Sequence, residues 1–184
     1  MKKIGILVGS LRKEAFSRKI AQYAATQFPG DFEIVWLDIS QLTIFNQDLE
    51  EEGMTPASWL QFREQVKQMD AFLFVTPEYN RSFPAAIKNA LDIGSRPFGQ
   101  NLWSGKPGAI ISVSPGRLGG FGSNHHLRQS FSFLNCYIMP QPEMYIGDVE
   151  SLLDENGAVV NERTQSSLHH FATAFAEWIA LFSK

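Results

Sequence analysis

A chain of 184 residues suits one domain with a sizeable core, and 44% hydrophobic against 19% charged residues excludes a disordered protein. A net charge of −3 without a basic run excludes nucleic acid or an anionic membrane as the main partner. No apolar run approaches the ~20 residues of a membrane span, no signal-peptide cleavage site follows the start, and Cys136 is the only cysteine, so we expect a cytoplasmic protein without membrane insertion or disulfide.

Strand and helix patterns alternate along the whole sequence, without an internal repeat or a linker. Apolar runs predict strands at 3–8, 33–38, 71–76, 108–113 and 136–139. Apolar residues at helical spacing predict helices at 15–28, 85–93, 123–134 and 162–182, and a further helix whose N-cap is Ser58. The pattern favours a single α/β domain, residues 1–184, with a five-stranded parallel sheet in the order 2-1-3-4-5 between two helix layers.

The first predicted strand ends in a loop, residues 10–17, that leads directly into a helix. Free backbone N–H groups and the positive end of the helix dipole favour an anion at such a helix start. Ser10 and Ser17 add hydroxyl donors, and Arg12 adds a charged fork. We interpret the loop as a site for a phosphate monoester; an ordinary turn with a capping serine is the alternative, and this loop alone does not decide between them.

Two more polar loops, residues 77–82 and 114–120, follow the third and fourth predicted strands. Carboxyl ends of parallel strands share one sheet edge, so the three loops are expected to lie together. Pro77 and Pro84 stiffen the second loop around Tyr79, while Gly116, Gly119 and Gly120 allow close backbone approach in the third. A phosphate site at one end and a place for a planar ring at the other predict a mononucleotide-like cofactor.

Several motifs resemble the NADPH-dependent FMN reductase family, and within it the bacterial chromate/quinone reductase and azoreductase branch. The motifs are Gly9-Ser10-Leu11-Arg12 with Ser17-Arg18-Lys19-Ile20-Ala21, Pro77-Glu78-Tyr79-Asn80-Arg81-Ser82-Phe83-Pro84, Lys88-Asn89-Ala90-Leu91-Asp92 and Ser114-Pro115-Gly116. The resemblance covers nearly the whole chain. It implies a flavodoxin-like three-layer sandwich that forms a homodimer or homotetramer, binds FMN non-covalently and takes electrons from NADPH or NADH.

Carried over by position, the resemblance assigns Ser10, Arg12 and Ser17 to the FMN phosphate. It assigns Pro77, Glu78, Tyr79, Asn80 and Ser82 to the isoalloxazine and ribityl chain, and Ser114 with Gly116 to the other ring edge. We further expect the Tyr79 and Asn80 amides to donate to the ring. The chain departs from the family pattern at three positions, with Ala15, Ser17 and Ile93 in place of Ser, Asn and Trp. Alanine at 15 lacks the serine hydroxyl that could donate to the phosphate, which removes ~1 kcal/mol of binding free energy.

The function implied is an NAD(P)H oxidoreductase that passes electrons through FMN to a small-molecule acceptor: a quinone, or an azo compound, chromate or free flavin. The flavin carries the chemistry, so no catalytic side chain is required. One alternative is an FMN-binding electron carrier without nicotinamide activity, although carriers are usually strongly acidic. A phosphate-binding regulatory domain is the last alternative, but the first strand lacks the acidic cluster that it would need.

The remaining polar residues have simpler interpretations. Arg81, Arg117 and Arg128 are surface arginines, or else recruit phosphates or an anionic acceptor. The adjacent pairs His125-His126 and His169-His170 point in different directions on a helix, so no metal site is predicted. Cys136 is expected to be a buried strand residue and not a redox centre, and Lys88 and Asp92 to form an exposed pair or contact a partner subunit.

Overall fold

The computed structural model describes residues 1–51 and 53–182. Its strands are β1 (Lys2–Val8), β2 (Phe32–Trp36), β3 (Ala71–Pro77), β4 (Pro107–Val113), β5 (Tyr137–Ile138) and β6 (Met144–Ile146). Its α-helices are α1 (Phe16–Ala25), α2 (Ala57–Lys67), α3 (Ala85–Gly94), α4 (Phe121–Leu134) and α5 (Glu162–Ala180). Within the described residues, no helix is both long enough and apolar enough to cross a membrane.

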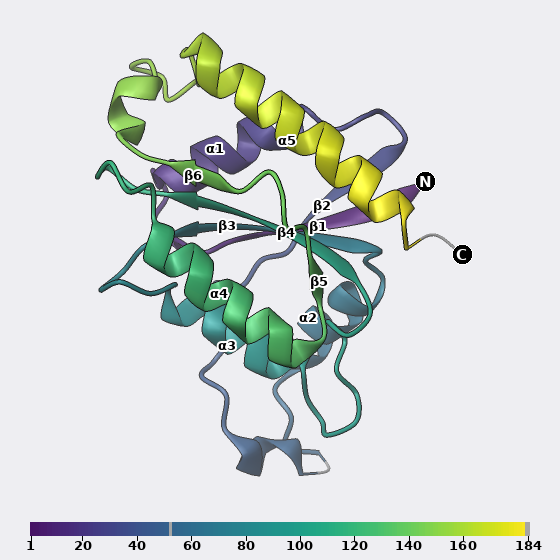
Figure 1. Cartoon of the computed structure of the whole chain (residues 1–184). Coiled ribbons are helices and arrows are strands. Elements are labelled where there is room, and N and C mark those ends of the chain that lie inside the picture. Colours follow the sequence, from purple (N-terminus) through teal and green to yellow (C-terminus); the bar gives the residue numbers. More distant parts are fainter. Residues whose placement is uncertain (52, 183–184) are drawn as a thin grey trace.

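All strand pairs are parallel, and the sheet has the order β2-β1-β3-β4-β5 that the sequence predicts. Figure 1 shows α1 and α5 on one face of the sheet and α2, α3 and α4 on the other. Successive strand residues alternate between the two faces, so Ile4, Ile6 and Val8 pack under α1 and α5 while Leu7 and Phe72 pack toward α2, α3 and α4. The three-layer, flavodoxin-like fold is therefore confirmed.

The edge beyond β4 differs from the single fifth strand predicted at 136–139. β5 covers only two residues and pairs with the start of β4, whereas β6 pairs with Ile111–Val113 at the other end. Pro140 and Pro142 separate β5 from β6, and proline cannot donate to a strand ladder. The short β6 has too few residues to show an alternating pattern in the sequence.

Two helix starts also differ from expectation. Ser58 is not the N-cap of α2, because Pro56 (φ −58°) occupies that position and Ser58 lies in the first turn. The helix predicted to start at residue 123 begins at Phe121, since Gly120 is its N-cap in a left-handed conformation (φ 77°). At the other end of the chain α5 buries Leu168, Phe171 and Phe175, as the helical spacing predicts.

Candidate functional site

The three predicted loops meet at one edge of the sheet. Val8 at the end of β1 is aligned with Val75 of β3, and Pro77 at the end of β3 is aligned with Val113 of β4. Side chains join the first two loops directly, because the Tyr79 hydroxyl lies 3.1 Å from Ser10 Oγ. The parallel topology thus brings together the segments that the sequence places after three separate strands.

Among the described residues, the first loop combines two buried serine hydroxyls, one of them unpartnered, with a helix start that no side chain caps. Ser10 and Ser17 are 3% and 2% exposed, and Ser17 Oγ has no hydrogen-bond partner within the described residues. The N-cap of α1 is Ala15, whose side chain cannot cap, and the first turn contains no acidic residue. Buried hydroxyls are normally hydrogen-bonded, so an unpartnered one beside an uncapped helix start indicates a place where an anion fits.

Arg12 is exposed beside these serines and forms no ion pair within the described residues. Its own backbone N–H donates to Ser10 Oγ at 3.4 Å, which holds the loop in a tight turn. An exposed, unpaired guanidinium at the mouth of the loop is suited to a second contact with an anion.

The second loop is a two-residue turn in a left-handed conformation. Asn80 and Arg81 have φ values of 51° and 66°, and the Tyr79 and Ser82 backbones exchange hydrogen bonds of 2.9 and 3.0 Å. Consecutive positive φ angles cost free energy in non-glycine residues, and such strain is concentrated at functional sites. The Tyr79 amide is already used by the turn, which leaves the Asn80 amide as the free donor of the two that were expected to bind a ring.

Glu78 faces the start of α4. Its Oε2 accepts a hydrogen bond from the Ser123 amide at 3.1 Å, and its Oε1 lies 3.4 Å from the Arg81 guanidinium. A carboxylate at a helix N-terminus is stabilised by the dipole and the free amides. The Glu78 carboxylate therefore fixes the second loop against α4. The predicted contact of Glu78 with a ring is left to its backbone and the methylene groups of its side chain.

Ser123 is a site residue that the sequence analysis missed. It is fully buried, its hydroxyl donates to the Pro77 carbonyl at 2.9 Å, and Thr76 Oγ1 lies 3.0 Å away. The helix that we predicted at 123–134 made this serine its first residue, whereas the observed helix begins two residues earlier. The signal that could have found it is Gly119-Gly120, a pair able to begin a helix earlier.

In the third loop Ser114 is half-buried and Gly116 is exposed. Ser114 Oγ accepts the Gly116 amide at 3.1 Å, so these two predicted residues form a local turn. Gly119 has φ 58°, and a Cβ there would lie 2.7 Å from the Tyr145 carbonyl carbon. Glycine is thus required at 119 for both conformation and space, and it lets β6 approach the loop.

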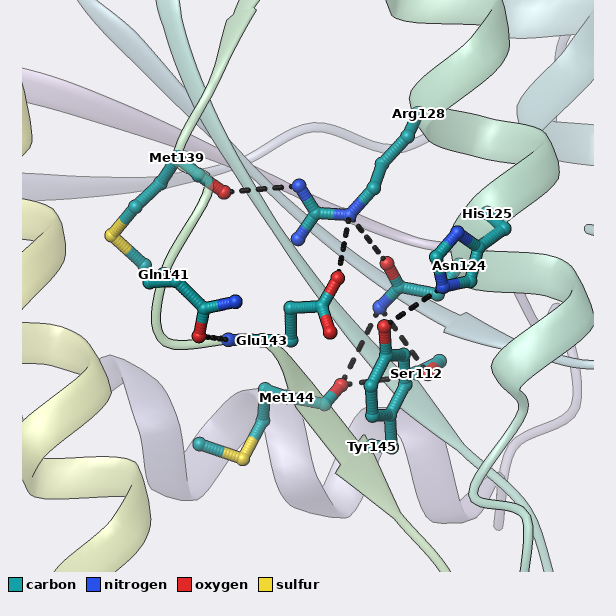
Figure 2. Close-up of polar contacts among 9 residues, drawn as sticks. All are labelled: Ser112, Asn124, His125, Arg128, Met139, Gln141, Glu143, Met144 and Tyr145. Carbon is teal, nitrogen blue, oxygen red and sulfur yellow. Dashed lines mark hydrogen bonds and ion pairs between the residues drawn. The ribbon is translucent and has the colours of Figure 1, made fainter.

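A polar network behind the third loop ties α4 to the β5–β6 connection, as Figure 2 shows. Arg128 donates to Asn124 Oδ1 at 2.9 Å and to the Met139 carbonyl at 3.1 Å, and Glu143 lies 4.0 Å from its guanidinium. Arg128 is therefore committed to holding the edge of the sheet, which removes it from the three arginines considered for phosphate recruitment. Arg81 and Arg117 remain exposed, with carboxylates at 3.4 and 4.0 Å.

The two histidines of α4 diverge, as adjacent helical residues should. His125 Nε2 lies 3.0 Å from the Tyr145 hydroxyl, whereas His126 Nδ1 lies 3.1 Å from Ser82 Oγ. Burial, with Glu143 nearby, raises the pKa of Tyr145 to about 12, so its phenol stays protonated and can donate to His125. His126 is a second residue, missed by the sequence analysis, that contacts the second loop.

Two other interpretations from the sequence are supported. Lys88 Nζ lies 2.7 Å from the Asp92 carboxylate on the solvent side of α3. Cys136 is buried, and burial raises its pKa to about 12, which keeps the thiol protonated and unreactive. It precedes β5 instead of lying in it.

The fold and the three loops at its switch point define a flavodoxin-like nucleotide-binding protein. Residues 2–151 match the model of the NADPH-dependent FMN reductase family, so the chain belongs to that family. It is 47% identical over 178 residues to a quinone reductase of Pseudomonas putida, across 97% of this chain and 95% of that protein. A 2-hydroxy-1,4-benzoquinone reductase of a Burkholderia species is 43% identical over 177 residues, across 96% of each chain. The solved structure of FerB, a flavoenzyme NAD(P)H:acceptor oxidoreductase of Paracoccus denitrificans, matches with a TM-score of 0.91 and 36% identity over 99% of both chains.

Proposed function

We propose that this protein is an FMN-dependent oxidoreductase that takes electrons from NADPH or NADH and reduces quinones. The observation that carries the proposal is the buried, unpartnered hydroxyl of Ser17 at the uncapped start of α1. Membership of the NADPH-dependent FMN reductase family and the similarity to quinone reductases support it.

The first loop fits the phosphate of FMN. Ser10 and Ser17 would donate through their hydroxyls, the first amides of α1 would donate along the helix axis, and Arg12 would close the outer side. Ala15 gives no side-chain donor, so the phosphate depends more heavily on the two serines and the amides.

The second and third loops would border the ring and the ribityl chain. Pro77, Tyr79, Asn80 and Ser82 would form one wall that includes the free Asn80 amide. Glu78 would act as a positioning residue through its hydrogen bond with the start of α4. Ser114 and Gly116 would border the opposite ring edge. When bound, FMN supplies the chemistry of hydride acceptance and electron transfer to the acceptor. The chain binds and orients the reactants, which is the larger share of what a protein contributes to such a reaction.

An absorbance experiment tests the proposal directly. Protein purified with excess FMN and then desalted is expected to keep flavin absorbance, to bleach on anaerobic addition of NADPH, and to recover on addition of a benzoquinone. Recovery with an azo dye or chromate would extend the range of acceptors. Loss of all flavin on desalting would overturn FMN binding, and retained flavin that NADPH does not reduce would favour the electron carrier.

We also propose that the protein forms a homodimer or homotetramer through the groove between α3 and α4, with a second copy as the occupant. Phe133 is 90% exposed beside this groove, next to the Lys88–Asp92 pair. Aromatic residues are enriched at interfaces between proteins, and this one lines a groove beside Leu91 and Leu134. Light scattering should give two or four times the 20.7 kDa chain mass, and Phe133→Asp should reduce it; a monomeric wild-type mass would contradict the proposal.

We place the protein in the cytoplasm, where reduced nicotinamide cofactors are available and where a single unpaired cysteine is stable. The whole chain acts there as one flavodoxin-like unit. Cell fractionation followed by immunodetection would test the location, and recovery in an extracellular or membrane fraction would contradict it.

A further inference from the structure

A hollow lies beside the first loop, on the side away from β3. It has a volume of about 560 Å³ and is open to solvent over the ends of β1 and β2. This volume lies within the range of small-molecule sites. The residues that line it are Ile6, Val8, Leu11, Lys13, Arg18, Trp36, Leu37, Asp38, Ile39 and Ser40.

The hollow follows from how α1 crosses the sheet. The helix packs mainly over β1, β3 and β4, so the edge strand β2 is less covered by it on that face. The residues of β2 are accordingly half-buried, and Trp36 at its end is 43% exposed. A large aromatic residue thus forms an accessible wall where no helix covers it.

The charged residues of the hollow have groups that are free to contact a ligand. Lys13 and Arg18 have no carboxylate partner within the described residues, although the neighbouring Lys19 pairs with Glu14 at 3.1 Å. Asp38 uses Oδ1 to accept the Ser40 amide at 2.8 Å, and its other oxygen remains available as an acceptor. Two cations, one acceptor and one aromatic face therefore surround the same cavity.

We propose that this hollow binds an adenosine phosphate, as the adenosine half of the nicotinamide cofactor. The indole of Trp36 offers a stacking face for adenine, Asp38 an acceptor for ribose hydroxyls, and Lys13 with Arg18 the charge for a phosphate. The inference rests on the proposed function. Two phosphates would then bind on either side of the first loop. Ser10 and Ser17 would bind the FMN phosphate, and Lys13 with Arg18 would bind the phosphate of the adenosine half in the hollow.

Calorimetry tests binding without any need for turnover. FMN-loaded protein is titrated with 2′,5′-ADP and with AMP, and the same titrations are made on Lys13→Ala/Arg18→Ala, on Trp36→Leu and on Arg163→Ala. The last removes an exposed cation on α5, away from the hollow. We expect binding that weakens at least about tenfold in the first two variants and is unchanged in the control. Absence of binding in the wild type, or equal binding in all variants, overturns the proposal.

Kinetics identify the source of the adenosine phosphate. NADPH is compared with reduced nicotinamide mononucleotide, which carries the same hydride-donating ring but no adenosine. In the Lys13→Ala/Arg18→Ala variant, the ratio of KM for NADPH to KM for the mononucleotide should be at least about tenfold higher than in the wild type. In the wild type, 2′,5′-ADP should compete with NADPH. Binding of 2′,5′-ADP without competition would assign the hollow to a free adenine nucleotide and overturn the cofactor assignment. If neither donor is oxidised, the proposed function fails, while calorimetry still decides whether the hollow binds adenosine phosphates.

Discussion

The hydroxyl oxygen of Tyr79 lies 3.1 Å from Ser10 Oγ, across the boundary between the second loop and the first. Ser10 is 3% exposed, whereas Tyr79 is 46% exposed, so the tyrosine covers the serine from the solvent side. If the tyrosine hydroxyl donates to Ser10 Oγ, the hydrogen of Ser10 is left for an oxygen of the FMN phosphate. The contact therefore couples the ring end of the proposed site to its phosphate end.

Tyr79→Phe should weaken FMN binding by about fivefold, because it removes one neutral hydrogen bond worth about 1 kcal/mol. The dissociation constant is measured by quenching of flavin fluorescence. Tyr23→Phe is the matched control, since the Tyr23 hydroxyl makes no hydrogen bond within the described residues. An unchanged constant in Tyr79→Phe would show that the contact does not support the phosphate.

Ser17→Ala should have opposite effects on the free and the FMN-bound protein. Without FMN, the buried Ser17 hydroxyl has no partner among residues 1–51 and 53–182, so its removal should leave the free energy of unfolding unchanged or raise it by up to about 1 kcal/mol. With FMN, the lost donor should weaken binding by about tenfold, through a hydrogen bond to a charged group. Urea unfolding with and without FMN measures both, and a destabilised apoprotein that binds FMN normally would contradict the prediction.

The sequence predicted the strand order and the meeting of the three loops because both follow from alternating elements in a parallel sheet. It could not predict the left-handed turn at Asn80 and Arg81, since neither residue is glycine and only the surrounding loop holds them there. The inward position of Arg128 was also hidden, because its partners Met139 and Glu143 lie on the connection between β5 and β6, a segment separate from α4. Long-range side-chain pairing of this kind leaves no local pattern in one sequence.

Gly119→Ala should destabilise the protein and disturb the third loop. The position combines φ 58° with a space in which a Cβ would lie 2.7 Å from the Tyr145 carbonyl carbon, so the backbone of β6 must move. Gly99→Ala is the control, because it has φ 80° but no atom within 4 Å of the new Cβ. Thermal unfolding should show a larger loss for Gly119→Ala than for Gly99→Ala, whose cost is limited to about 1 kcal/mol of backbone strain. Equal losses would mean that conformation alone, without crowding, sets the requirement at 119.

The ion pair between Glu50 and Arg96 should make stability depend on acid pH. The Arg96 side chain donates to Glu50 through Nε at 2.8 Å, and this hydrogen bond lowers the pKa of Glu50 below its ordinary value. A carboxyl whose pKa is lowered by folding stabilises the native state above its ordinary pKa, and that contribution is lost as the pH falls through the lowered pKa. The pair joins a short 3₁₀ helix before α2, Gln47–Glu50, to the segment after α3.

Glu50→Gln should therefore be less stable than the wild type at neutral pH, and the difference should shrink once the pH falls below the ordinary carboxyl range. Urea unfolding at a series of pH values measures the two curves. Glu155→Gln is the control, because Glu155 is exposed and forms no ion pair within the described residues; its curve should follow that of the wild type. A constant difference between Glu50→Gln and the wild type at all pH values would show that the glutamine disturbs packing, and that ionisation of Glu50 contributes nothing.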